Sequence, residues 1–236
     1  MEKSLVNRGI RFFWTIFQYN VFFFAANAVL VFSFFAFLLH WLTLPFYMLG
    51  IFLLFPALQA LFLSMKRREQ WIDTTPFKMY LRCYKEEFYG ALKLALSYVF
   101  AVLLLGGSYA AIGYVPGEFA FIPLYALLAI ILFIHLIFAL LIRSNFEINL
   151  VGTWRLGFYC ISRYPLKAFF LLGGTLVAVG VSNTFNQLIV LGILPAMVCL
   201  ATIFTETMFN DIRITLNIPI SQSYEKFGKT DSASKS

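Results

Sequence analysis

Long apolar blocks constrain what this chain can fold into more than any other feature. Six stretches of roughly 20 residues carry almost no charge, and each could cross the ~30 Å hydrocarbon core of a bilayer as a helix. Because backbone groups in lipid must be satisfied internally, the blocks predict an all-α, polytopic membrane bundle of six transmembrane helices. The predicted spans are 20–42, 45–65, 91–113, 120–142, 168–186 and 188–209.

The basic residues predict the orientation of these spans. All 18 Lys and Arg residues lie before the first block, in the second and fourth connections and the helix start at Lys93, or after the last block. The positive-inside rule then places both termini in the cytoplasm, in a multi-pass protein of the cytoplasmic (inner) membrane. The net charge of +7 reflects this orientation, and nucleic acid is not an expected partner. Residues 1–216 form one membrane domain, and 217–236 form a polar, loosely ordered cytoplasmic tail.

The two inner connections are expected to be helical and amphipathic. In "FKMYLRCYKEEFYGAL", which begins at Phe77, aromatic residues recur at helical spacing with basic residues largely elsewhere. Such a segment could lie in the headgroup region as its own helix, or it could extend the following span into the cytoplasm. Pro76 suits the first position of that helix.

No enzyme motif or metal-ligand spacing occurs, so no catalytic residue, cofactor or metal is expected, and the protein is predicted not to be an enzyme. The three cysteines have no paired spacing, and no disulfide is expected. Polar residues within the spans are the remaining candidates for a functional site, although such groups commonly join helices through hydrogen bonds instead. These candidates are Asn27, Gln59, His135 and Glu206.

Glu206 has two interpretations, because it lies about one turn from the predicted cytoplasmic end of the last span. It could pair with a basic residue at the inner rim of the membrane, or it could serve a substrate or proton. Basic residues of the inner connections could in turn dock a partner protein. These are Arg82, Lys85, Arg155 and Arg163.

A shift of 77 residues overlays part of the chain on itself. Lys66 falls on Arg143, Phe77 on Trp154, Lys78 on Arg155, Cys83 on Cys160, and Ala91 on Ala168. The pattern suggests a duplicated helical hairpin, although apolar sequences also match one another by chance.

Two segments, "FPALQALFLSMKRR" (55–68) and "FKMYLRCYKEEFYGALKLAL" (77–96), resemble the YesL-like family of bacterial integral membrane proteins, a family of unknown function. Phe55 departs from the family pattern, which has glycine before the proline. The resemblance implies a non-enzymatic accessory component of a carbohydrate uptake system of the ATP-binding-cassette (ABC) type. Its partners would be the lipid bilayer and permease subunits, and it could form oligomers. The alternative from the residues alone is an autonomous transporter or channel for small solutes.

Overall fold

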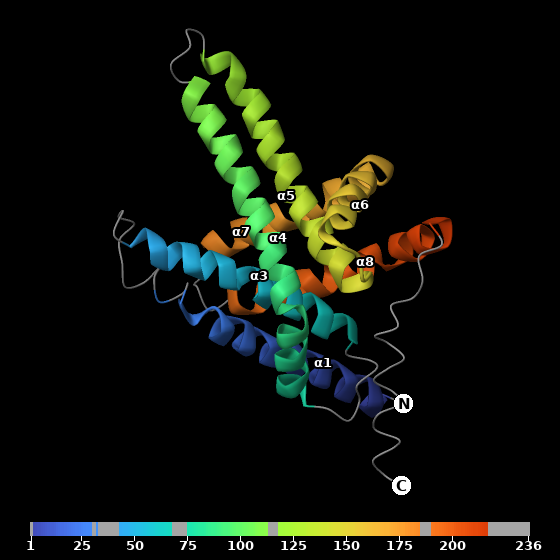
Figure 1. Cartoon of the computed structure of the whole chain (residues 1–236). Coiled ribbons are helices and arrows are strands. Elements are labelled where there is room, and N and C mark those ends of the chain that lie inside the picture. The colour runs from blue at the N-terminus through green and yellow to red at the C-terminus, as the bar shows by residue number, and fades with distance from the viewer. Residues whose placement is uncertain are drawn as a thin grey trace.

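The computed structural model describes residues 2–29, 32, 43–67, 75–112, 118–184 and 190–216, and within these ranges the regular structure is helical (Figure 1). The all-α prediction is therefore confirmed for this part of the chain. The elements are α1 (Glu2–Ala26), α3 (Leu44–Arg67), α4 (Pro76–Ile112), the short 3-10 helix η1 (Glu118–Phe121), α5 (Ile122–Asn145), α6 (Leu150–Arg163), α7 (Pro165–Thr184) and α8 (Val190–Leu216).

Three of the described helices are long and apolar enough to cross a membrane. They are Pro45–Arg67, Pro76–Ile112 and Phe119–Asn145, and they coincide with the second, third and fourth predicted spans. A shorter apolar helix, Pro165–Val177, forms the first part of α7. A membrane-embedded protein is thus confirmed, whereas the count of six spans and the orientation of the termini stay predictions.

The predicted first span and the predicted tail can be compared with the structure only in part. Helix α1 begins at Glu2, so the N-terminal basic residues are part of a helix that starts well before the predicted span 20–42. Most of the second half of that span, including 33–42, lies outside the described residues, as does the tail 217–236.

Helix α4 shows which of the two predicted arrangements residues 77–92 adopt. It runs without interruption for 37 residues from Pro76, so the amphipathic segment extends the following apolar helix and does not form one of its own. Proline suits the first helical position because its missing N–H group would have no intrahelical acceptor there. Pro56, by contrast, lies inside α3 and is buried.

The second inner connection forms a separate amphipathic helix, as predicted. The Asn149 side chain caps α6 by accepting a hydrogen bond of 2.7 Å from the Gly152 backbone N–H. The buried face of α6 follows the spacing i, i+3, i+4 and i+7, which is one side of a helix. Its members are Thr153, Leu156, Gly157 and Cys160.

The α4–α5 hairpin extends away from the other helices (Figure 1). Only the half that holds the first part of α4 and the last part of α5 joins the core, and we call it the inner half; the half next to η1 is the outer half. Leu94 and Tyr98 of α4 are buried, as are His135 and Phe138 of α5. Helix α3 packs against α4, α5 and α8, and α1 packs against α8, α4 and α3. The core therefore lies where the inner half of the hairpin meets these helices.

The positions related by the 77-residue shift have similar surroundings. Cys83 and Cys160 are both buried, as are Ala91 and Ala168, while Lys66 and Arg143 are both half-buried. Phe77 and Trp154 differ, because Phe77 is exposed and Trp154 is half-buried. The counterpart of the unbroken α4 is interrupted before Pro165, which gives α6 and α7. Duplication stays a prediction that these burial patterns favour.

Candidate functional site

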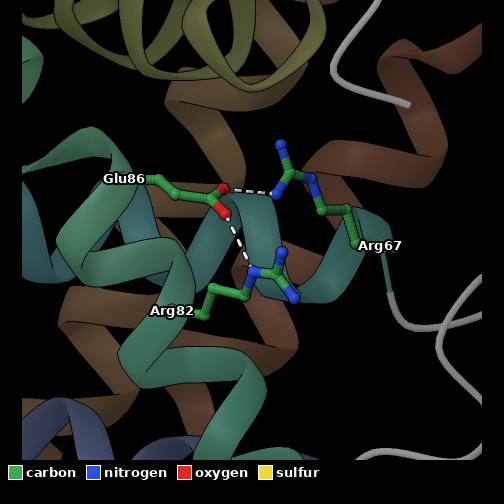
Figure 2. A network of polar contacts seen from close by, with 3 residues as sticks. All are labelled: Arg67, Arg82 and Glu86. Atoms are coloured by element: carbon green, nitrogen blue, oxygen red, sulfur yellow. Dashed lines mark hydrogen bonds and ion pairs between the residues drawn. The ribbon is translucent and has the colours of Figure 1, made fainter. Parts of the chain in front are cut away.

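A cluster of charged side chains lies at the C-terminal ends of α3 and α5, against the first half of α4. The Glu86 carboxylate accepts hydrogen bonds from Arg67 Nη1 at 2.6 Å and from Arg82 Nε at 3.1 Å, and thus bridges two arginines (Figure 2). The Arg67 side chain is only 10% exposed, so its charge needs this carboxylate more than a surface arginine would. We call this set, with the residues added in the next two paragraphs, the inner charge cluster, after the side of the membrane that the charge distribution of the sequence predicts for it.

Arg143 and Lys66 extend the inner charge cluster along α5. Arg143 Nη2 lies 2.8 Å from the Glu87 carboxylate, and the side chains of both residues are less than a quarter exposed. Lys66 Nζ donates to the Asn145 side-chain oxygen and, at 3.5 Å, to the Ser144 backbone oxygen. Gly90 provides the space that Arg143 occupies, because a Cβ at Gly90 would lie 2.0 Å from Arg143 Nη2.

Helix α8 adds a carboxylate and a further cation to this cluster. The Lys66 ammonium is attracted by Glu206 and repelled by Arg213 and Arg67. The Arg213 guanidinium lies 6.0 Å from the centre of the Phe146 ring, a cation–π arrangement. The buried Arg213 Nε has no hydrogen-bond partner in the described structure.

A second polar contact joins the start of α7 to α8. The Tyr164 hydroxyl donates to the Asp211 carboxylate, and this hydrogen bond raises the pKa of Tyr164 to about 12. Lys167 Nζ donates to Thr207 Oγ1 at 2.9 Å. Both contacts lie next to the break between α6 and α7, so they attach that break to α8.

His135 is the centre of a buried aromatic cluster formed by α4, α5 and α6. Its Nε2 lies 3.0 Å from the Trp154 backbone oxygen, and its Nδ1 contacts the Tyr98 hydroxyl. The ring centre of His135 lies 4.5 Å from that of Trp154 and 4.3 Å from that of Phe158. The Trp154 indole in turn donates to Ser97 Oγ at 3.2 Å. These contacts tie α6 to the inner half of the hairpin.

The partners of His135 determine its tautomer. A backbone carbonyl only accepts, so Nε2 carries the hydrogen and Nδ1 accepts from the Tyr98 hydroxyl. Both ring nitrogens are therefore engaged, and neither is open to a ligand. Gly157 is required beside the ring, because a Cβ there would lie 2.5 Å from Nε2.

The four polar candidates from the sequence differ in burial, and the described structure shows no direct contact between them. Asn27, Gln59 and His135 are buried, whereas Glu206 is exposed, and no hydrogen bond joins any two of them in the described part of the chain. Asn27 Nδ2 donates to the Phe23 backbone oxygen of its own helix at 2.8 Å. Both side-chain amide atoms of Gln59 are buried, and no described residue forms a hydrogen bond with them; the same holds for Asn20 on α1.

The basic residues considered for partner docking are more accessible. Lys85, Arg155 and Arg163 are exposed, and Arg82 is half-buried beside Glu86. Among the described residues, no group of three or more His, Cys, Asp or Glu side chains could hold a metal ion.

Sequence reasoning missed the groups that surround His135 and Lys66. Tyr98 and Trp154 were not identified as hydrogen-bonding residues, because an aromatic residue in an apolar block suggests only lipid contact or packing. The spacing of Asn149 to Gly152 before an apolar helix face could have identified the helix cap.

Long apolar helices and an inner cluster of charges define a helical protein embedded in a membrane. Residues 16–109 match the family model described as "Protein of unknown function, DUF624", the family that includes YesL-like proteins. The resemblance found in the sequence is thereby confirmed. Comparison with curated proteins and with solved structures returned no significant match.

Proposed function

We propose that this protein is a non-enzymatic accessory component of a bacterial carbohydrate uptake system of the ABC type, and that it binds permease subunits through its cytoplasmic side. The observation that carries the proposal is a basic surface on the two helices that follow the inner ends of α3 and α5. Lys85 on α4 and Arg155 and Arg163 on α6 are exposed. The nearby carboxylates of Glu86 and Glu87 are already engaged by Arg67, Arg82 and Arg143. Within the described part of the chain, no ion pair involves the three exposed cations, which supports their use by an external partner.

The geometry of α6 supports docking of this kind. Its buried face is anchored to α4 and α5 by the His135 cluster, so the opposite face is presented on a rigid element. Preorganised side chains lose less entropy on binding than those of a mobile loop. Charged residues at such a surface increase the association rate and the specificity of binding more than the affinity itself.

The test is co-purification of the tagged protein from native bacterial membranes after mild cross-linking. We expect ABC permease subunits with the wild type, and loss of most of that recovery when Lys85, Arg155 and Arg163 are all replaced by Gln. A matched control replaces the tail residues Lys226, Lys229 and Lys235 by Gln, which removes the same charge outside the membrane domain. Unchanged recovery from the α4 and α6 variant would contradict docking through this surface, and recovery of no permease subunit would contradict the accessory role.

A second candidate function, an autonomous small-solute transporter or channel, is favoured by one observation. The amide groups of Gln59 and Asn20 are fully or almost fully buried, and the described residues supply no hydrogen-bond partner for either. Buried amides without partners are costly, and a polar solute would satisfy them. The check is uptake into liposomes that contain only this protein. Transport that is lost in Gln59→Leu, with normal thermal unfolding of the variant, would favour this function over the accessory role.

A further inference from the structure

The exposed side of α6 combines basic and aromatic residues in a regular pattern. Exposed residues that follow one another at intervals of one turn form a single ridge along the helix. They are Val151, Arg155, Tyr159 and Arg163, and Phe158 is exposed beside them. The sequence of α6 contains no acidic residue, and its two arginines form no ion pair within the described part of the chain. This side of α6 therefore presents positive charge and apolar surface together.

Phe158 is held in one position although almost half of it is exposed. Its exposed fraction is 47%, and its ring centre lies 4.3 Å from that of His135 and 6.1 Å from that of Trp154. His135 is itself fixed by contacts at both ring nitrogens. A side chain that is ordered before binding loses little entropy when a partner covers it. Because aromatic and arginine side chains dominate the binding energy of many interfaces, Phe158 has the features of an anchor residue.

The spacing of the two arginines defines what fits them. Arg163 follows Arg155 by about two helical turns, roughly 12 Å along the axis, and Phe158 lies between them. Two carboxylates about seven or eight residues apart on a second helix have nearly the same separation. A residue three or four positions after the first carboxylate then lies between the two on the same face. Guanidinium groups bind carboxylates through strong, directed hydrogen bonds, so this spacing favours such a helix.

We propose that the permease element that docks on α6 is an amphipathic helix with two carboxylates about two turns apart and an apolar side chain between them. The carboxylates pair with Arg155 and Arg163, and the apolar side chain covers Phe158. This inference rests on the permease docking proposed above, and it adds the chemical class and the spacing of the partner. The headgroup layer of a membrane is also anionic, but its charges have no fixed spacing that matches two arginines on either side of an aromatic ring.

Photo-cross-linking identifies the contact directly. Phe158 is replaced by p-benzoylphenylalanine in the full-length protein, and native membranes are irradiated before purification. We expect a cross-linked permease peptide that contains two acidic residues about two turns apart. The same replacement at Phe119, which is 75% exposed in η1, should not give this peptide. Cross-links from position 158 to lipid or to a peptide without the acidic pair, or no cross-link, would overturn this inference. The accessory role would still stand if permease subunits co-purify with the wild type, whereas recovery of none would contradict both.

A charge exchange then tests the pairing. Arg155→Glu should lower the recovery of permease subunits by roughly tenfold or more, because it places like charges opposite one another. Arg155→Lys, which keeps the charge, should retain part of the recovery. Lys78→Glu, the same charge change at an exposed position of α4, should leave recovery unchanged. Replacing the facing carboxylate of the cross-linked peptide by Lys should restore recovery with Arg155→Glu. Unchanged recovery with Arg155→Glu, an equal loss with Lys78→Glu, or no restoration by the exchange would overturn the proposal.

Discussion

The inner and outer halves of the α4–α5 hairpin differ in what surrounds them. In the inner half, His135 is 0% exposed and Tyr98 is 3% exposed, and both contact side chains of other helices. In the outer half, Leu103 is 61% exposed and Leu127 is 53% exposed. Tyr109 of α4 meets Tyr125 of α5, a contact within the hairpin.

This difference indicates which half of the hairpin determines how the helices pack. Lipid tails are as apolar as leucine, so an outer half of Leu, Val and Phe needs no particular neighbour to be stable in a bilayer. A histidine or an arginine at membrane depth requires specific partners and therefore determines which helices meet. The polar contacts of the inner half thus select one arrangement of α3, α4, α5 and α6.

The largest expected effect tests whether the two halves face opposite sides of the membrane. A cysteine at Gly117, in the connection beyond the outer half, should react with a membrane-impermeant maleimide in intact cells. A cysteine at Ser162, near the end of α6, should react only after permeabilisation. Both are measured in a chain whose native cysteines are replaced by alanine. Labelling of Gly117→Cys only after permeabilisation would refute the predicted orientation.

The next effect concerns the thiol of Cys160 on the buried face of α6. Burial raises the pKa of Cys160 to about 12. Since the thiolate is the reactive form, its fraction at pH 8 should fall about a thousandfold below that of an ordinary thiol. Iodoacetamide should therefore modify Cys160 slowly in folded protein and rapidly in denaturant, in a chain where Cys83 and Cys199 are alanine. The control is Ser162→Cys, exposed on the same helix, and equal rates at the two positions would contradict the burial of Cys160.

Replacement of His135 should destabilise the inner half. His135→Ala leaves the Tyr98 hydroxyl and the Trp154 carbonyl without their partner and opens a cavity between three helices. A loss of about 3–5 kcal/mol is expected from these two terms together. The measurement is the unfolding free energy in detergent. A loss below about 1 kcal/mol would show that this cluster does not hold α6 to the hairpin.

The smallest effect is expected in the outer half. Leu103→Ala removes a side chain that is 61% exposed, and alanine favours a helix at least as well as leucine. Its unfolding free energy in detergent should remain within ~0.5 kcal/mol of the wild type. A change as large as that of His135→Ala would remove the distinction between the two halves.

The sequence predicted features that depend on hydropathy and charge alone. Pro76 as a helix start, the three long apolar helices and the amphipathic α6 could all be predicted from short-range patterns. The same patterns left two possibilities for residues 77–92, because an amphipathic helix has the same periodicity whether it ends or continues into the next span. The uninterrupted α4 depends on the absence of a helix break near Phe88, the position that the 77-residue shift relates to Pro165.

The candidate site was less predictable because its contacts are long-range. His135 was identified as polar and intramembrane, but its partners Tyr98 and Trp154 are 37 and 19 residues away along the chain. Lys66 and Asn145 are separated by 79 residues. Periodicity within one helix places such residues on a face but does not specify which face of another helix they meet. Glu206 was assigned to the inner rim with a basic neighbour expected, and Lys66 lies within electrostatic range of it.

The unbroken length of α4 has a mechanical consequence. Thirty-seven residues at ~1.5 Å each give a rod of about 55 Å, almost twice the ~30 Å thickness of the hydrocarbon layer. The first part of the rod is held by the Tyr80 hydrogen bond to the Ala57 backbone oxygen and by the ion pairs of Glu86 and Glu87, whereas the outer part contacts α5 through Tyr109 and Tyr125. Long helices accommodate a thinner bilayer by tilting. Because the part that begins at Pro76 is fixed in this way, a tilt of the outer part would strain the ion pairs that Glu86 and Glu87 make with α3 and α5. A change in membrane thickness would thereby alter the geometry of these charges at the other end of the hairpin.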